Sequence, residues 1–277
     1  MALKLMYITN RPEIAKIAEA AGIDRIFVDM EFIGKASRQG GMDTVQLHHT
    51  VMDIRNIRNA VSKAKVMVRV NPIHTETEFY PSSECEINDA INAGAEILML
   101  PYFKTSEEVL YFLRCVNGRV KTLLLFETPE SVALIDEILS ISGIDEAFIG
   151  LNDLSLGYGM KFMFQLLADG MVDALCAKFR DAGIPYGFGG IAALGKGKLP
   201  AEYIIKDHYR LGSTCTIVSR SFCNTSEIND IDEIASFFKN GIKEIRELEH
   251  ECLSYSCEAF DQNHKALRER VNDILLM

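Results

Sequence analysis

The stretch VKTLLLFETPESVALIDEILSI, from Val120 to Ile141, holds one complete strand and helix signal. It opens with a continuous apolar run, which is typical of a parallel strand that is buried on both faces. The run stops at Glu127, and the letters TPES that follow carry the hydroxyl residue and the early proline of a helix start. The stretch therefore predicts a buried β-strand, an acidic residue at its carboxyl end, and an α-helix.

The same alternation extends in both directions along the chain. Helical patterns ending in Gly22, Gly94, Gly118 and Gly183 separate further short apolar runs. These runs are KLMYIT (4–9), RIFVDME (25–31), KVMVRVN (65–71), EILMLPYF (96–103), EAFIGLND (146–153), IPYGFGG (184–190) and CTIVSRSF (215–222). Eight such strands in 277 residues predict an α/β fold, a TIM (β/α)8 barrel. The alternative is a doubly wound open sheet, which is disfavoured because no G-x-G-x-x-G motif follows the first strand.

The chain continues beyond the last predicted strand. We assign residues 1–223 to the barrel strands and active site, and residues 224–277 to C-terminal helices. The stretch 234–253 has one apolar stripe and is expected to be the eighth barrel helix. The stretch 257–277 predicts an extra C-terminal helical segment that packs on a neighbouring subunit. Alternatively, this segment covers the bottom of its own barrel.

Composition restricts the class of partner and the compartment. The net charge of -10 argues against nucleic acid and anionic membrane as partners, because both need a basic face. No apolar run approaches the length of a transmembrane helix. The seven cysteines form no C-x-x-C pair, which indicates reduced thiols. We therefore expect a cytoplasmic protein that acts on a small molecule.

Polar residues gather at the ends of the predicted strands. The carboxyl ends of barrel strands surround the active site, so these residues are expected to share one mouth. They are Asp29 and Glu31 after strand 2, Arg69 and Asn71 in strand 3, Glu127 after strand 5, Asn152 and Asp153 after strand 6, and Ser219 and Arg220 after strand 8.

Glu127 and Asp153 follow neighbouring strands, which lie about 4.8 Å apart in a sheet. Two carboxylates this close repel each other unless a cation lies between them. Two protein carboxylates, with the remaining positions left for water and substrate oxygens, are typical of a Mg²⁺ or Mn²⁺ site. The alternative for each acid is a helix cap at its own strand-to-helix turn.

Arg69 lies between valines and keeps its charge when buried, so it must meet an anion. One interpretation is a structural salt bridge with Asp29 or Glu31. The other is a two-bond grip on a substrate carboxylate. The two interpretations are compatible.

Several segments together resemble the HpcH/HpaI aldolase and citrate lyase beta-subunit superfamily, from about Arg11 to Asn224. These segments are PEIAKIAEAAGIDRIFVDME, MVRVNP, GAEILMLPYFKTSEEV, LLLFETPESVALIDEIL and GIDEAFIGLNDLSLGYG. The resemblance implies a TIM barrel that binds Mg²⁺ or another divalent cation such as Mn²⁺ or Co²⁺. It also implies a homo-oligomer, as a trimer or hexamer.

By position, the resemblance makes Glu127 and Asp153 the metal ligands. It assigns Arg69 to the carboxylate of a 2-keto acid, and Glu31, supported by Asp29, to the acidic position of strand 2. The implied reaction is the cleavage or formation of a carbon–carbon bond through the enolate of pyruvate or a related 2-keto acid, with an aldehyde or acyl partner. Asn152 is expected to contact the substrate.

Two positions depart from the family pattern. Phe32 stands where the class II pyruvate aldolases have a catalytic histidine, and Leu125 stands where they have a glutamine. Two other functions therefore stay open: a CoA-ester lyase or thioesterase, as in the citrate-lyase-like branch, and a non-catalytic ligand-binding barrel.

The long loop after strand 2 offers replacements for the missing base. His48 and His49 lie near the mouth by topology, with an ordinary pKa that suits a general base. Alternatively, they are exposed polar residues at a helix start. Lys35, Arg38 and Gln39 are candidates to bind an anionic group of the substrate, or else belong to a solvated loop.

Two further signals carry no function. The segment GIAALGKG, from Gly190, lacks the final hydroxyl residue of a nucleotide-binding P-loop. His208 is expected on a helix, at the surface or in packing.

Overall fold

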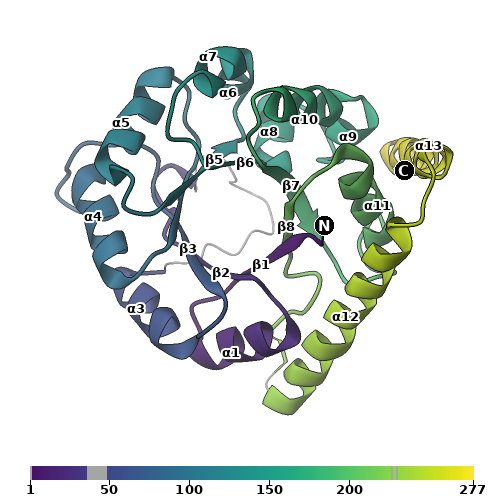
Figure 1. The fold of residues 1–277 in the computed structure, drawn as a ribbon, viewed down its shortest axis with the longest axis horizontal. Helices are drawn as coiled ribbons and strands as arrows, with labels where there is room; N and C mark the ends of the chain where they lie inside the picture. The colour runs from purple at the N-terminus through teal and green to yellow at the C-terminus, as the bar shows by residue number, and fades with distance from the viewer. Residues whose placement is uncertain (1, 36–48, 226, 229) are drawn as a thin grey trace.

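The computed structural model describes residues 2–35, 49–225, 227–228 and 230–277, and in these ranges eight parallel strands close into one barrel in sequence order (Figure 1). The strands are β1 (Lys4–Ile8), β2 (Arg25–Asp29), β3 (Lys65–Arg69), β4 (Ile97–Leu100), β5 (Lys121–Phe126), β6 (Glu146–Ile149), β7 (Tyr186–Ile191) and β8 (Cys215–Val218). Each strand pairs in parallel with the next, and β8 pairs with β1. The predicted TIM barrel is confirmed.

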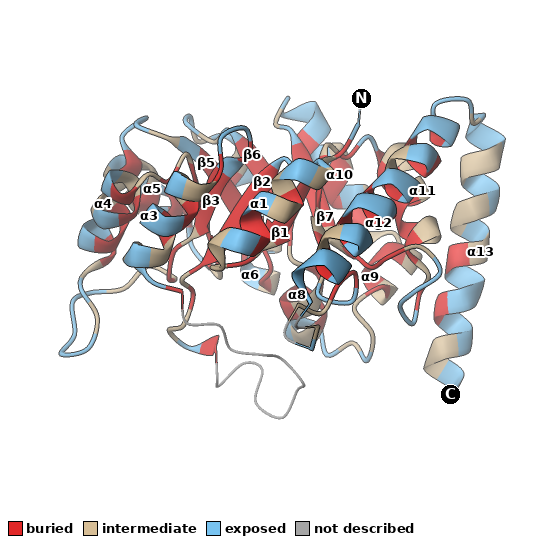
Figure 2. Cartoon of the chain, turned by 90° about the horizontal axis from the view of Figure 1, so that it is seen from below, coloured by how far each residue is buried: buried red, intermediate tan, exposed pale blue. Residues whose placement is uncertain are grey.

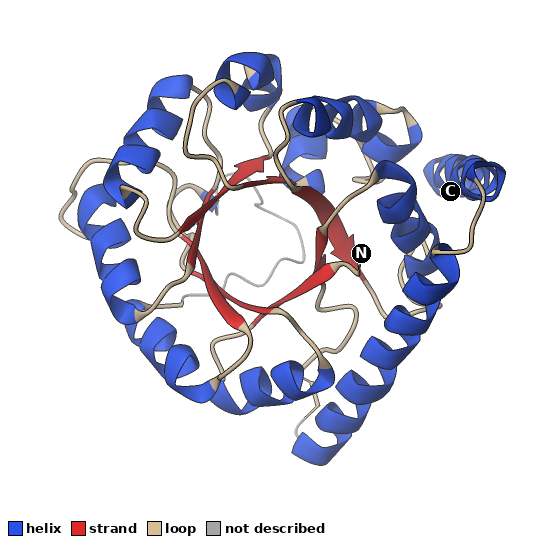
Figure 3. Cartoon of the chain, viewed as in Figure 1, coloured by secondary structure: helices blue, strands red, loops and turns tan. Residues whose placement is uncertain are grey.

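Helices form a ring around the strands (Figure 3). They are α1 (Pro12–Ala21), α3 (Val51–Ala60), α4 (Ser83–Ala93), α5 (Ser106–Val116), α6 (Pro129–Ala133), α7 (Ile135–Leu139), α8 (Leu151–Gly157), α9 (Gln165–Ala168), α10 (Met171–Asp181), α11 (Ala201–Leu211), α12 (Ile231–Cys252) and α13 (Cys257–Leu276). Among the helices of the described residues, none is both long and apolar enough to cross a membrane.

The two C-terminal helices have different surroundings. α12 packs against α1 and α11, and it therefore takes the position of the eighth barrel helix. α13 lies outside the ring and packs on α11 and α9 (Figures 1 and 2). Its side chains Leu267 and Val271 are buried in this contact. α13 thus covers part of the side of its own barrel, and not the bottom.

Two details differ from the sequence-based expectation. The helix expected after Glu127 is two short helices, α6 and α7, because Leu134 between them has a ψ of 10° and breaks the helical geometry. β6 ends at Ile149, so Asn152 and Asp153 lie in the first turn of α8 and not at the end of a strand.

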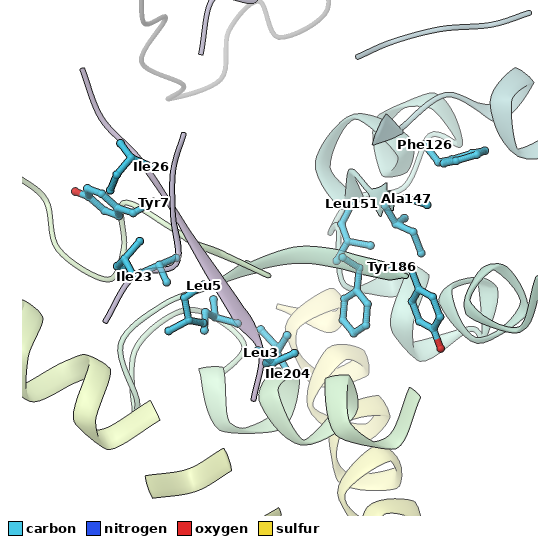
Figure 4. Close-up of a cluster of buried hydrophobic side chains, with 14 of the residues drawn as sticks. Leu3, Leu5, Tyr7, Ile23, Ile26, Phe126, Ala147, Leu151, Tyr186 and Ile204 are labelled. Atoms are coloured by element: carbon cyan, nitrogen blue, oxygen red, sulfur yellow. The ribbon is translucent and has the colours of Figure 1, made fainter. Parts of the chain in front are cut away.

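The apolar core has two layers, because successive side chains of a strand point to opposite faces. The larger layer fills the space between strands and helices, and Figure 4 shows part of it, with Leu5 and Tyr7 of β1 and Ile204 of α11. Buried residues are concentrated in the strands and on the inner sides of the helices (Figure 2). The smaller layer lies inside the barrel and contains Met6, Phe27, Met67, Ile97, Met99, Leu123, Leu125, Phe148 and Cys215.

An ion pair lies at the amino-terminal end of the barrel strands. Arg25 at the start of β2 donates two hydrogen bonds of 2.7 Å to the carboxylate of Glu146 at the start of β6. Both side chains are buried. A buried ion pair therefore lies at this end of the barrel, and the candidate site residues lie at the opposite end.

Candidate active site

A cavity of about 370 Å³ lies at the carboxyl ends of the strands. Its floor is the top of the inner apolar layer, including Leu125 and Phe148. Its polar lining residues are Asp29, Lys35, Arg69, Glu127, Asn152, Asp153, Ser219 and Arg220. The structure thus brings six of the predicted site residues to one cavity, from β2, the loop after it, β3, β5 and α8.

On one side of this cavity, Arg69 is tied to Asp29. Its Nε and Nη2 atoms each donate a 2.8 Å hydrogen bond to one oxygen of the Asp29 carboxylate. The guanidinium also lies over the ring of Phe27, 5.6 Å from the ring centre. The structural salt bridge expected for Arg69 is therefore present, and the fork of Arg69 is already engaged on that edge.

Two further charges complete the cluster. Lys35 Nζ donates a 2.9 Å hydrogen bond to Asp29 Oδ2 and lies 3.6 Å from Glu31 Oε2. Arg69 Nη1 lies 3.2 Å from the same Glu31 oxygen. Two cations thus meet two anions. All four groups are mostly removed from water, where opposite charges attract strongly.

Burial alone would raise the pKa of Asp29, but the charges and hydrogen bonds of Arg69 and Lys35 outweigh it. The pKa of this carboxyl therefore lies well below its usual range. Burial would lower the pKa of Arg69, and the carboxylates of Asp29 and Glu31 raise it instead. Both groups stay ionised, so Asp29 acts here as an anchor for cations and is a poor proton acceptor.

The loop residues show three outcomes. Lys35 is buried and ion-paired, which overturns the solvated-loop interpretation for this residue. Glu31 is buried behind Asp29 and is not among the residues that line the cavity. Arg38, Gln39 and His48 lie outside the described residues.

His49 is placed behind the cluster. Its Nδ1 accepts a 2.9 Å hydrogen bond from the backbone N–H of Asp29, and the residue lines a different cavity. Burial lowers the pKa of His49 and favours the neutral ring. No histidine of the described ranges lines the cavity at the strand ends. The expected position of His49 at the mouth is therefore corrected, because its ring bonds the backbone of Asp29 and the residue lines the other cavity.

The other side of the cavity carries Glu127 and Asp153. Both side chains are buried, and both line the cavity. Glu127 Oε1 accepts a 2.9 Å hydrogen bond from the backbone N–H of Tyr102, and Asp153 Oδ1 accepts one of 3.0 Å from Asn152 Nδ2. The donors of these two hydrogen bonds are neutral groups, and the charge of Arg69 also acts on Glu127.

Neither acid is a helix cap. Thr128 caps α6, with its side chain accepting from the backbone N–H of Ser131. Gly150 occupies the N-cap position of α8, which has no side-chain cap hydrogen bond. The capping alternative for Glu127 and Asp153 is therefore wrong, and Asp153 lies instead in the first turn of α8.

The donor set fits a divalent cation of the magnesium type. Two carboxylates and room for water and substrate oxygens are what Mg²⁺ takes from a protein. A Cβ atom on Gly150 would lie 2.8 Å from Glu127 Oε2, so glycine here leaves space for the carboxylate. Within the described residues, no group of three or more His, Cys, Asp or Glu side chains is arranged to hold a metal. The protein would therefore supply these two ligands.

Sequence reasoning gave no role to two residues that the structure places at the site. Arg220, directly after β8, lines the cavity and is exposed to it. Its position in the sequence, after an apolar run that ends in a polar pair, is the signal that identifies it. Tyr102 has a positive φ of 48°, which a non-glycine residue rarely adopts, and this conformation supports its N–H bond to Glu127.

Two solved structures share this fold at low sequence identity. The HpcH/HpaI aldolase from Desulfitobacterium hafniense DCB-2 superposes with a TM-score of 0.59 at 17% identity, over 88% of this chain and 93% of that one. A HpcH/HpaI aldolase/citrate lyase family protein from Burkholderia cenocepacia J2315 superposes with a TM-score of 0.62 at 15% identity, over 89% and 94%. These likenesses support the fold.

Two curated relatives match shorter parts of the chain, and both are named hydroxypyruvate/pyruvate aldolase. The one from Sagittula stellata is 26% identical, over 37% of this chain and 52% of its own length. The one from Rhizorhabdus wittichii is 48% identical over 48 residues, which are 17% of this chain and 19% of that protein. The chain thus spans about half of one curated relative and about a fifth of the other.

The family comparison covers more of the chain. The sequence model of the HpcH/HpaI aldolase/citrate lyase family matches residues 4–165, which include β1 to β6 and the polar residues at their ends. This is more than half of the 277 residues. The chain belongs to the HpcH/HpaI aldolase/citrate lyase family.

Proposed function

We propose that this protein is a metal-dependent lyase of the aldolase type, which cleaves or forms a carbon–carbon bond next to a 2-keto acid such as pyruvate. The observation that carries the proposal is the pair of buried acids, Glu127 and Asp153, in the cavity that also holds Arg69 and Arg220. The names of the two curated relatives support the substrate class.

Glu127 and Asp153 would hold the divalent cation, in the position that their shared cavity offers. When bound, such an ion polarises a keto oxygen and stabilises the enolate that forms from it. Tyr102 and Asn152 would orient the two carboxylates through their hydrogen bonds. Mg²⁺, Mn²⁺ and Co²⁺ are the candidate ions.

The cations of the cavity would bind the substrate carboxylate. Arg69 is fixed by Asp29 and contributes its positive charge to the cavity wall. Arg220 carries a second, exposed guanidinium on the β8 side. An arginine that is held in place before the substrate arrives loses little conformational entropy on binding.

We propose the proton acceptor of the reaction by eliminating Asp29 and His49. Asp29 keeps its charge through Arg69 and Lys35, and His49 Nδ1 is occupied by a backbone N–H. His48 therefore remains our candidate base, and Arg38 and Gln39 remain candidates to contact the aldehyde or acyl partner.

A proton-exchange experiment tests the proposal. Pyruvate is incubated with the protein in D2O, and loss of the methyl signal is followed by NMR with added Mg²⁺ or Mn²⁺. Metal-dependent exchange without CoA is the expected result, because enolate formation needs no thioester. Exchange or hydrolysis that requires a CoA ester would support the CoA-ester alternative. Binding of pyruvate without exchange would support a non-catalytic barrel.

We also propose that the chain forms a homo-oligomer, a trimer or hexamer, through the outer face of α13. This face is largely exposed, while the inner face packs on α11 and α9. Light scattering measures the molar mass in solution of the full chain and, separately, of a chain that ends at Ser256. A monomer in both cases would contradict it.

A further inference from the structure

A second cavity, of about 300 Å³, lies outside the barrel beside the ends of β2 and β3. Its apolar walls include Met30, Phe32 and Tyr80, and the rings of Phe32 and Tyr80 lie 6.1 Å apart. Its polar lining residues are His49, Thr50, Asn71, His74, Glu86 and Asp89. It shares no lining residue with the cavity that holds Glu127 and Asp153.

His49 lines this cavity and carries a buried hydrogen-bond donor. Its Nδ1 accepts from the backbone N–H of Asp29, so the neutral ring carries its proton on Nε2. This Nε2 is buried, and it has no hydrogen-bond partner in the described part of the chain. A buried donor without a partner is costly, which indicates that something else satisfies it.

Glu86 presents an acceptor at the same cavity. Its Oε1 accepts from both the backbone and the side-chain nitrogen of Asn71, at 3.0 and 2.9 Å. Its Oε2 is buried and lacks a hydrogen-bond partner among the described residues. His74 Nε2 lies 4.0 Å from this oxygen, beyond hydrogen-bond distance. Burial raises the pKa of Glu86, as expected for a carboxyl with an incomplete set of partners.

We propose that this cavity is a binding site for a small uncharged hydroxylated compound, such as a short diol. A hydroxyl group accepts from His49 Nε2 and donates to Glu86 Oε2, and a second hydroxyl or a methyl group contacts the apolar walls. Anions are disfavoured because Glu86 and Asp89 both line the cavity. Ammonium groups are disfavoured because they cannot accept the His49 hydrogen bond.

The site is connected to Asp29 and the loop after it through two short links. His49 bonds the backbone N–H of Asp29, the residue that anchors Arg69. Asn71, which Glu86 holds, accepts from the backbone N–H groups of Phe32 and Ile33 at 2.8 and 2.9 Å. A bound compound would therefore contact His49 and Glu86, whose hydrogen bonds help to position Asp29 and the loop after it.

Methionine methyl NMR tests the proposal, because Met30 lines this cavity while Met99 and Met163 line the other. The protein, labelled with ¹³C at its methionine methyl groups, is titrated with propane-1,2-diol, with lactate and with 1-amino-2-propanol. The Met30 signal, assigned with Met30→Leu, should move saturably with the diol. It should respond at least about tenfold more weakly to the two charged compounds.

Two variants distinguish a ligand-binding site from a cavity that holds only water. His49→Phe removes the donor and Glu86→Gln weakens the acceptor, so each should reduce diol affinity about tenfold. His264→Gln, on α13, should bind the diol as the unaltered chain does. The proposal is overturned if the Met30 methyl signal does not move, or if only the Met99 and Met163 signals move. It is also overturned if His49→Phe and Glu86→Gln both bind the diol as tightly as the unaltered chain. A buried water would then satisfy the two atoms. Because the readout is a resonance outside the metal cavity, the outcome is independent of whether the chain catalyses pyruvate exchange.

Discussion

The two sides of the strand-end cavity treat their acids differently. On the β2 and β3 side, Asp29 and Glu31 meet Arg69 and Lys35 at distances between 2.8 and 3.6 Å. On the β5 and β6 side, Glu127 and Asp153 accept hydrogen bonds from an amide N–H and a side-chain amide. The β2 and β3 side is thus a network of ion pairs, and the β5 and β6 side presents two carboxylates to one cavity.

From this difference we infer a structural role for the β2 and β3 side, and we propose the β5 and β6 side as the place for a cation. Burying charged groups costs desolvation free energy, and this cost is offset only when every buried charge has a partner of opposite sign. The four charged groups on the β2 and β3 side meet this condition. Two carboxylates that line one cavity are of the type that binds a hard divalent ion.

The largest expected effect is on activity, from the β5 and β6 side. Glu127→Gln and Asp153→Asn should each lower the rate of pyruvate exchange by about a thousandfold or more, because each removes a ligand of the proposed ion. Excess chelator should do the same to the unaltered chain. NMR in D2O measures all three rates.

Glu130→Gln is the matched control for this effect. Glu130 is an acid in the same strand-to-helix segment, and it pairs at the surface with Lys104 at 2.9 Å. The rate of pyruvate exchange by the Glu130→Gln variant should equal that of the unaltered chain. Equal rates in all three acid variants would contradict the assignment of Glu127 and Asp153.

On the β2 and β3 side, the largest effect should be on stability. Asp29→Asn leaves the charges of Arg69 and Lys35 buried with too little negative charge, at a cost of about 3 kcal/mol in the free energy of unfolding. Urea unfolding at neutral pH measures it. Glu130→Gln, which breaks only the surface pair with Lys104, should cost far less, and a larger loss there would contradict the stabilising role of Asp29.

The stabilisation by Asp29 should decrease as the pH falls. Its pKa is lowered in the folded chain, so its contribution is complete above the unfolded pKa of about 4 and is lost as the pH falls below that value. The difference in unfolding free energy between the unaltered chain and Asp29→Asn should therefore shrink from pH 5 to pH 3. A constant difference across that interval would show that Asp29 is not the titrating anchor.

The smallest expected effect comes from a methyl group beside Glu127. Gly150→Ala should weaken Mn²⁺ binding about tenfold, because the added Cβ would lie 2.8 Å from the Glu127 Cβ and Oε2 atoms. Gly190→Ala is the control in the same cavity, since its Cβ would meet only ordinary contacts at 3.6 Å. Similar affinities for the two variants would mean that Glu127 does not depend on this space.

The sequence predicts the fold and the strand ends well because both follow from local patterns. Continuous apolar runs identify the eight strands, and the residue that ends each run identifies Asp29, Arg69 and Glu127. The end of the sixth run also identifies Asp153, although it lies in the first turn of α8, and the family resemblance, which the match over residues 4–165 supports, assigns it the same role.

What the sequence could not predict depends on contacts between distant segments. His49 is near the mouth by topology, but the orientation of its ring is set by a hydrogen bond to a residue twenty positions earlier. Lys35 looks like a solvated loop residue until its partner Asp29 is known. His208, expected on a helix at the surface or in packing, is fully buried and stacked on Phe188 at 3.8 Å, so the packing alternative holds.

Direct titration with Mn²⁺ tests the central claim, that the β5 and β6 acids hold a divalent ion. Electron paramagnetic resonance reports free Mn²⁺ and therefore measures the bound fraction without any need for turnover. The unaltered chain and Glu130→Gln should show one tight site, and the double variant Glu127→Gln, Asp153→Asn should lose it. Equal Mn²⁺ binding by the double variant and the unaltered chain would contradict the account.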